Sequence, residues 1–133
     1  MLQTLSNLVV PVILEPGEIT VVIVNQSMVA EFDCSAAGIP TPDISWFRVF
    51  DSESVVELTT DGRVMITQLQ PDNEYLLEDR GIVSQVNSTL LLMNTEDADS
   101  STYICNATNS VGSDDGQFEL IVQSKFMCTN GIM

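Results

Sequence analysis

The segment Asp99-Ser-Ser-Thr-Tyr-Ile-Cys105 decides the fold of this 133-residue chain. Tyr103 and Cys105 are two positions apart, so both side chains point to the same face of a β-strand. Residues 28–34 alternate in the same way and end at Cys34, and Trp46 follows between the two cysteines. The chain therefore directs two cysteines and two large aromatic side chains toward one interior.

The remainder of the chain has the same period-two alternation, interrupted at short intervals by turn residues, and no stretch has helical periodicity. This pattern predicts an all-β protein. Asp61-Gly62 predicts a type I′ hairpin between two of the strands, whereas segments 70–81 and 112–116 are expected to be a loop and a turn. The predicted strands cover residues 9–14, 19–24, 28–34, 44–48, 55–60, 63–68, 89–93, 102–108 and 117–123.

The order Cys, Trp, Tyr-x-Cys resembles the signature of immunoglobulin domains. Segments 37–46, 88–94 and 99–112 extend this resemblance to the I-set domains of cell-adhesion molecules and receptors. The resemblance implies a two-sheet antiparallel Greek-key sandwich with one disulfide between the sheets. It assigns the disulfide to Cys34 and Cys105, packed against Trp46, and makes Tyr103, Leu90 and Asp99 the other signature residues.

Two features depart from the family pattern. Ser101 occupies the position where the family usually has glycine in the turn before tyrosine. The interval from Trp46 to Cys105 is long for an I-set domain, and we assign the excess to an insertion at residues 52–84. The resemblance also implies a structural salt bridge to Asp99, for which Arg80 is the first candidate and Arg63 the second.

Charge and composition exclude several classes of function. Four Lys and Arg residues oppose 19 Asp and Glu residues, and the net charge of −15 disfavours nucleic acids and anionic membranes as partners. The chain has no histidine, which removes the commonest general base and the commonest zinc ligand. We therefore expect no catalytic residues, no metal site, no cofactor and no insertion of this segment into a membrane.

The resemblance implies a protein-binding module on the outside of a cell, and another immunoglobulin-superfamily ectodomain is one candidate partner. The sequons at Asn25, Asn87 and Asn106 are candidate glycosylation sites in such a protein. Within the insertion, the apolar residues 75–77 are candidate ligand contacts: Tyr75, Leu76 and Leu77. The alternative is a structural spacer in an intracellular muscle-type array of I-set domains, where the cysteines would stay reduced.

We expect the domain to cover residues 9–123, with an N-terminal extension at 1–8 and a C-terminal tail at 124–133. Neither a signal peptide nor a membrane anchor is recognisable in this sequence. The third cysteine, Cys128, is left over in the tail and could join two chains through a disulfide. A free thiol at this position is the simpler expectation.

Overall fold

The computed structural model describes residues 8–70, 74–77 and 81–124. Alternating apolar residues along these segments form strands, and Pro and Gly residues separate several of them. The elements are β1 (Val9–Glu15), β2 (Thr20–Asn25), β3 (Ala30–Ile39), β4 (Asp43–Asp51), β5 (Ser54–Leu58), β6 (Val64–Leu69), β7 (Glu74–Leu77), β8 (Gly81–Leu92), the 3-10 turn η2 (Asp97–Asp99), β9 (Ser101–Asn109) and β10 (Gly112–Gln123).

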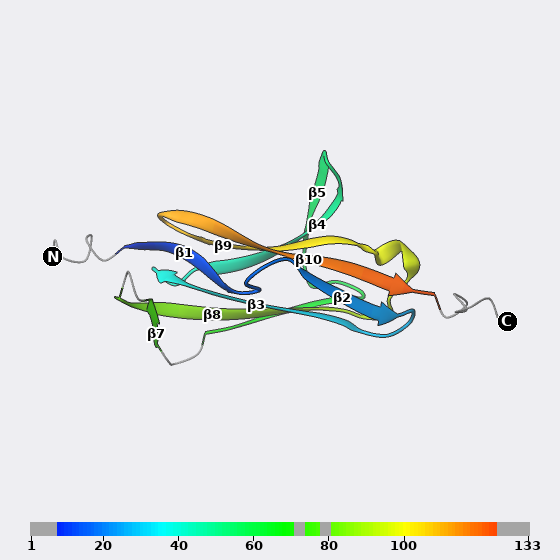
Figure 1. Cartoon of the computed structure of the whole chain (residues 1–133), viewed down its shortest axis with the longest axis horizontal. Helices are drawn as coiled ribbons and strands as arrows, with labels where there is room; N and C mark the ends of the chain where they lie inside the picture. Colours follow the sequence, from blue (N-terminus) through cyan, green and yellow to red (C-terminus); the bar gives the residue numbers. More distant parts are fainter. Residues whose placement is uncertain (1–7, 71–73, 78–80, 125–133) are drawn as a thin grey trace.

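The strands form the two layers of a sandwich (Figure 1). Sheet 1 has the order β1-β3-β8-β6, with β7 also paired to β8, and sheet 2 has the order β2-β10-β9-β4-β5. All strand pairs are antiparallel except β2 with β10, which is parallel. This exception arises because the chain changes sheets between β1 and β2, around Pro16-Gly17. The predicted all-β sandwich is confirmed, although it is not antiparallel throughout.

The predicted hairpin at Asp61-Gly62 is wrong. Strand β5 pairs with β4 in sheet 2, whereas β6 pairs with β8 in sheet 1. Asp61 and Val64 do form a tight bridged turn, and Gly62 has the positive φ of 57° expected for it. The turn therefore lies on a crossover between the sheets. Alternation identified both strands but could not show which sheet each one joins.

Two other segments differ from the expectation. Residues 70–81 are not all loop, because β7 lies within this segment and pairs with the first residues of β8. Residues 112–116 do not form a turn, because they pair with Cys105–Asn109 as the first part of β10. In both cases, a polar segment that resembles a loop or a turn belongs to a strand, and this strand pairs with its neighbour in the sequence.

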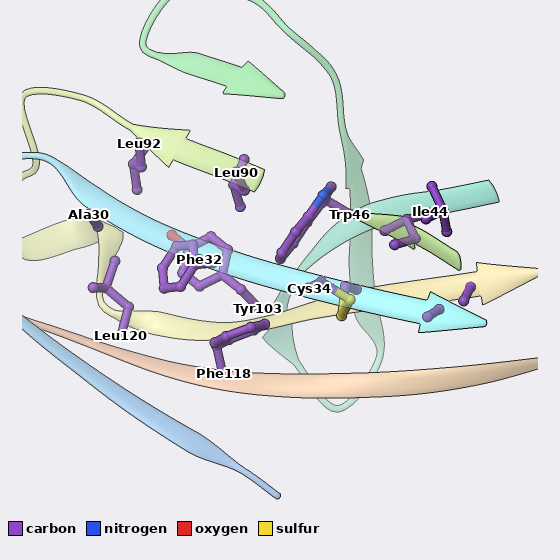
Figure 2. Packing of buried hydrophobic residues seen from close by; sticks show 14 of the residues in the cluster. Ala30, Phe32, Cys34, Ile44, Trp46, Leu90, Leu92, Tyr103, Phe118 and Leu120 are labelled. Atoms are coloured by element: carbon purple, nitrogen blue, oxygen red, sulfur yellow. A yellow bond between two sulfur atoms is a disulfide. The ribbon is translucent and has the colours of Figure 1, made fainter. Parts of the chain in front are cut away.

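The core fills the space between the sheets with side chains from alternate positions (Figure 2). Four aromatic rings meet at its centre: Phe32 lies 5.2 Å from both Tyr103 and Phe118, and Trp46 lies 5.7 Å from Phe118, between ring centroids. Leu90 is fully buried beside them. Large side chains stabilise a fold by roughly 1.5–3 kcal/mol each when fully buried. The aromatic cluster is therefore a principal source of stability.

Gly116 provides space for the disulfide and for the bend before β2. It pairs with Cys105, and a Cβ atom placed on it would lie 2.9 Å from the Cys105 Sγ and 2.8 Å from the Pro16 Cδ. The Sγ atom and the proline ring cannot move aside as the end of a flexible side chain would.

We expect Gly116→Ala to lower the free energy of unfolding by about 1–3 kcal/mol, because the added methyl group overpacks the core. Chemical denaturation of the variant and the wild type measures the difference. Gly17→Ala is the control, since no atom lies within 4 Å of the corresponding Cβ position. Equal stability of the Gly116→Ala variant and the wild type would contradict the close contact.

Candidate functional site

The disulfide joins Cys34 of β3 in sheet 1 to Cys105 of β9 in sheet 2, with Cα atoms 6.6 Å apart. The exposed fraction of either cysteine is at most 2%. Trp46 on β4 is directly opposite Cys105 in the strand register and is fully buried. Figure 2 shows the indole and the disulfide within the same core cluster. The bond therefore connects the two layers through the centre of the molecule.

The indole of Trp46 has a polar partner that the sequence did not indicate. Its Nε1 donates to the Ser88 Oγ at 2.8 Å, and the Ser88 hydroxyl donates to the Thr67 carbonyl oxygen at 2.8 Å. Burying an N–H group without a partner is costly. Ser88 thus allows the indole to lie in the interior and connects it to β6.

Asp99 is the centre of a charged cluster at one end of the sandwich. Two Arg63 nitrogens, Nη1 and Nη2, donate to its carboxylate at 2.9 and 3.1 Å, and the Glu96 backbone N–H donates to it at 2.8 Å. Burial alone would raise the pKa of Asp99, but the hydrogen bonds from Arg63 and Glu96 and the charges of Arg63 and Arg48 lower it. The carboxylate is therefore stabilised in its ionised form.

Arg48 is the second cation in this cluster. Its Nη1 lies 3.8 Å from the Asp99 Oδ1, and its Nη2 donates to the Ala98 carbonyl oxygen. The guanidinium also lies over the ring of Phe50, 4.3 Å from the centroid. Arg48 and Arg63 are the two basic residues in the described part of the chain, and both are committed to Asp99.

Of the two predicted salt-bridge partners of Asp99, Arg63 makes the bond. The structural reason is that Arg63 lies just before β6 and also donates to the carbonyl oxygens of Met93 and Asn94. These contacts hold its guanidinium beside η2. The first candidate, Arg80, lies outside the described residues.

Tyr103 completes this end of the core. Its hydroxyl donates to the Asp99 carbonyl oxygen at 2.6 Å, which connects β9 back to the preceding turn. Two residues before Tyr103, where the family usually has glycine, the Ser101 hydroxyl donates to the Val49 carbonyl oxygen. The tyrosine contact is therefore present despite the substitution of the glycine.

Burial of the Tyr103 ring raises the pKa of its hydroxyl to about 12. In a Tyr75→Phe variant, where Tyr103 is the remaining tyrosine, we expect phenolate absorbance to develop near this pH. The unfolded chain ionises nearer pH 10, so unfolding is favoured as the pH rises from about 10 to about 12, by about 1.4 kcal/mol per pH unit. An absorbance midpoint near 10 with the fold intact would contradict this environment.

The three sequon asparagines lie on the outer faces of the sheets. Asn25 is exposed at the end of β2, and in the described part of the chain its side chain has no hydrogen-bond partner. The side-chain oxygen of Asn87 accepts a hydrogen bond from the side-chain amide of Gln85 at 3.0 Å. The side-chain amide nitrogen of Asn106 donates to the Asp115 carboxylate, and its side-chain oxygen accepts from the Thr108 hydroxyl at 2.6 Å. Asn25 is therefore the sequon whose side chain is least engaged.

The apolar residues proposed as ligand contacts lie on β7. Leu76 is 66% exposed, whereas Leu77 is partly buried. The side chain of Tyr75 lies outside the described residues, as does Cys128. Of the three proposed contacts, Leu76 is thus the one that the described part of the structure places as an exposed apolar side chain.

The outer face of sheet 2 has an apolar centre with carboxylates beside it. Val49 pairs with Val55, and Phe47 pairs with Ile104 on the adjacent strand. A shallow hollow of about 320 Å³ lies here, lined by Phe47, Val55, Ile104, Asn106 and Asp115. This combination of apolar and polar groups is suited to a protein contact.

Within residues 8–70, 74–77 and 81–124, no group of three or more Cys, Asp or Glu side chains could hold a metal ion. None of the described helices is long and apolar enough to cross a membrane. The buried carboxylate of Asp99, whose pKa is lowered, is paired with Arg63 and Arg48, so its arrangement is that of a structural ion pair.

The chain matches the family model "Immunoglobulin I-set domain" over residues 15–122. It is 29% identical to mouse hemicentin-2 over 105 residues (79% of this chain, 2% of hemicentin-2) and 29% identical to human palladin over 112 residues (83% and 6%). It is 34% identical to the chicken cell adhesion molecule DSCAML1 over 91 residues (68% and 4%). The chain thus spans a small part of each relative's length.

Solved structures show the same architecture. Titin domain M7 superposes with a TM-score of 0.64 at 24% identity, covering 87% of this chain and 96% of the titin domain. At this level of identity the likeness supports the fold.

Proposed function

Because the chain belongs to the immunoglobulin I-set family, we propose that it is a non-catalytic protein-binding domain of an extracellular adhesion molecule or receptor. The observation that carries this proposal is the buried disulfide between Cys34 and Cys105. Such bonds persist in oxidising compartments and are rare in the cytosol. The match to DSCAML1, a cell adhesion molecule, supports the same function.

The binding surface that we propose is the outer face of sheet 2 around Phe47 and Ile104. Its apolar centre would supply contact area, and Glu57 and Asp115 beside it would favour a basic partner. Because Arg48 and Arg63 are engaged by Asp99, the described surface offers carboxylates with few competing cations. Leu76 of the insertion is a second, smaller candidate contact.

A second candidate function is that of a structural spacer in an intracellular array. The matches to palladin and titin fit this alternative. The first strand begins and the last strand ends at opposite ends of the long axis (Figure 1), as successive domains in a linear array require. Both functions use the same fold, so the compartment distinguishes them.

The test uses cells that naturally produce the protein and an antibody against this domain. We expect the antibody to stain intact, unpermeabilised cells, and we expect an endoglycosidase to increase the protein's electrophoretic mobility. Asn25→Gln, Asn87→Gln and Asn106→Gln variants then assign the modified sequons. Staining only after permeabilisation, with no change in mobility, would refute the extracellular proposal and favour the spacer.

A further inference from the structure

Strand β2 is an open edge of sheet 2. In the described part of the chain it pairs on one side only, with β10, and all six of its residues keep an uninterrupted register with that strand. A strand paired on one side directs a row of backbone N–H and C=O groups outward, where another strand can pair with them. Figure 1 shows β2 beside β10.

The edges at β1, β5 and β6 carry features that oppose such pairing, and β7, the remaining described edge, is only 4 residues long. Strand β1 contains Pro11 and two register irregularities, the pairing of β5 with β4 is irregular between Val49 and Asp51, and β5 carries a charge at Glu57. On β6, the Thr60 hydroxyl bonds both the N–H and the carbonyl oxygen of Ile66. Strand β2 has no proline, no charge and no irregularity, so its edge is the one best suited to strand addition.

Apolar side chains extend along the outer face of this edge. Ile19, Val21 and Ile23 are each more than half exposed. Ile121 of β10 is directly beside Ile23 and is also exposed. A strand added at β2 would cover part of this surface.

The charge distribution indicates what could pair there. Residues 19–27 carry no charge, although the chain as a whole has a net charge of −15. Contacts between two copies through surfaces that carry carboxylates would bring like charges together, whereas contact through this uncharged edge would not. We propose that β2 pairs antiparallel with β2 of a second copy of this chain, about a two-fold axis.

The alternation of side chains restricts the register of this pair. The two outer faces stay on the same side of the joined sheet when Val22 is opposite Val22 of the second copy. Val21 is then opposite the second copy's Ile23, a favourable apolar pair, and Glu18 is opposite Gln26. No two carboxylates are opposed, and sheet 2 continues through both molecules. The pairing goes beyond the proposed function and holds in either compartment.

Salt dependence distinguishes this contact from binding to a basic partner. Two copies with the same large charge repel each other, and salt screens this repulsion, so self-association becomes tighter as salt increases. Binding to a basic partner would instead weaken. Between 0.1 M and 1 M salt the Debye length falls from about 10 Å to about 3 Å, which makes the contrast large.

The experiment is sedimentation equilibrium of the whole chain in a Cys128→Ser background, which prevents disulfide-linked dimers. We expect a monomer–dimer equilibrium that tightens from 0.1 M to 1 M salt. Ile23→Lys should weaken association by about tenfold or more, because lysine on an edge opposes pairing and occurs twice in the dimer. Ile82→Lys is the matched control, since Ile82 has the same 57% exposure on the other sheet.

Trp46 fluorescence and thermal unfolding establish that each variant is folded, and Val21→Lys provides a second test of the edge. A wild-type chain that remains monomeric at both salt concentrations, with a dissociation constant weaker than about 1 mM, would overturn the proposal. The proposal would also be overturned if Ile23→Lys and Ile82→Lys lost association equally, or if both variants associated as tightly as the wild type. None of these outcomes changes the test of the compartment described above.

Discussion

Replacing Cys34 and Cys105 together by alanine is expected to lower the free energy of unfolding by about 4 kcal/mol. The bond closes a chain segment with a sequence separation of 71, and in the loop-entropy model this restricts the unfolded state by about that amount. Both cysteines are buried, and Trp46 lies beside them, so truncation also removes packing. Guanidinium denaturation followed by fluorescence of the single tryptophan measures the loss.

Two comparisons make this result specific. Cys128→Ser, which leaves the core bond intact, is expected to change stability little. Reduction of the wild type should reproduce most of the loss seen in the double variant. A loss below about 1 kcal/mol would show that the disulfide contributes far less than its position across the core implies.

Asp99→Ala is expected to lower the free energy of unfolding by about 3 kcal/mol. The substitution leaves Arg48, whose side chain is only 17% exposed, without its counter-charge and the Glu96 N–H without its acceptor. Removing one partner of a buried ion pair costs about 3–5 kcal/mol, and we take the lower part of this range because Arg63 is 38% exposed. Denaturation at neutral pH gives the value.

Asp97→Ala is the matched control, because it removes the same charge from an exposed position of the same turn. Combining Asp99→Ala with Arg63→Ala should cost less than the sum of the two single changes. Additive losses would show that Arg63 and Asp99 do not interact.

The pH dependence of stability follows from the lowered pKa of Asp99. A carboxyl group whose pKa is lower in the folded state stabilises the fold above its ordinary pKa of 3.8, and this contribution is lost as the pH falls below that value. The stability difference between wild type and Asp99→Ala should therefore diminish in acid. Denaturation of the wild type and of Asp99→Ala at several pH values between neutral and acid measures this change.

The signature residues were predictable because each is determined by local pattern. Alternation around Cys34 and Cys105 and the spacing to Tyr103 place these side chains inward irrespective of sheet order. The resemblance to I-set domains then supplied the disulfide and the position of Trp46. Local pattern and family likeness together placed the disulfide, Trp46 and Tyr103, but did not single out Phe32 and Phe118, the other two rings at the centre of the core.

Features that depend on contacts between distant segments were not predictable in this way. The sequence could not choose between Arg63 and Arg80, because the choice depends on where β6 lies relative to η2. It did not indicate Ser88 as the partner of Trp46, and Gly116 was interpreted as part of a turn although it makes room for the disulfide. The open edge at β2 likewise depends on the order of strands in sheet 2.

The most direct test of the proposed extracellular function is the redox state of Cys34 and Cys105 in the protein's natural setting. Living cells are treated with a permeant alkylating reagent before lysis, so that oxidation during extraction cannot contribute, and the protein is then digested and analysed by mass spectrometry. We predict that the peptides containing the two cysteines are found linked and unalkylated. Alkylation of both Cys34 and Cys105 as free thiols would contradict this function.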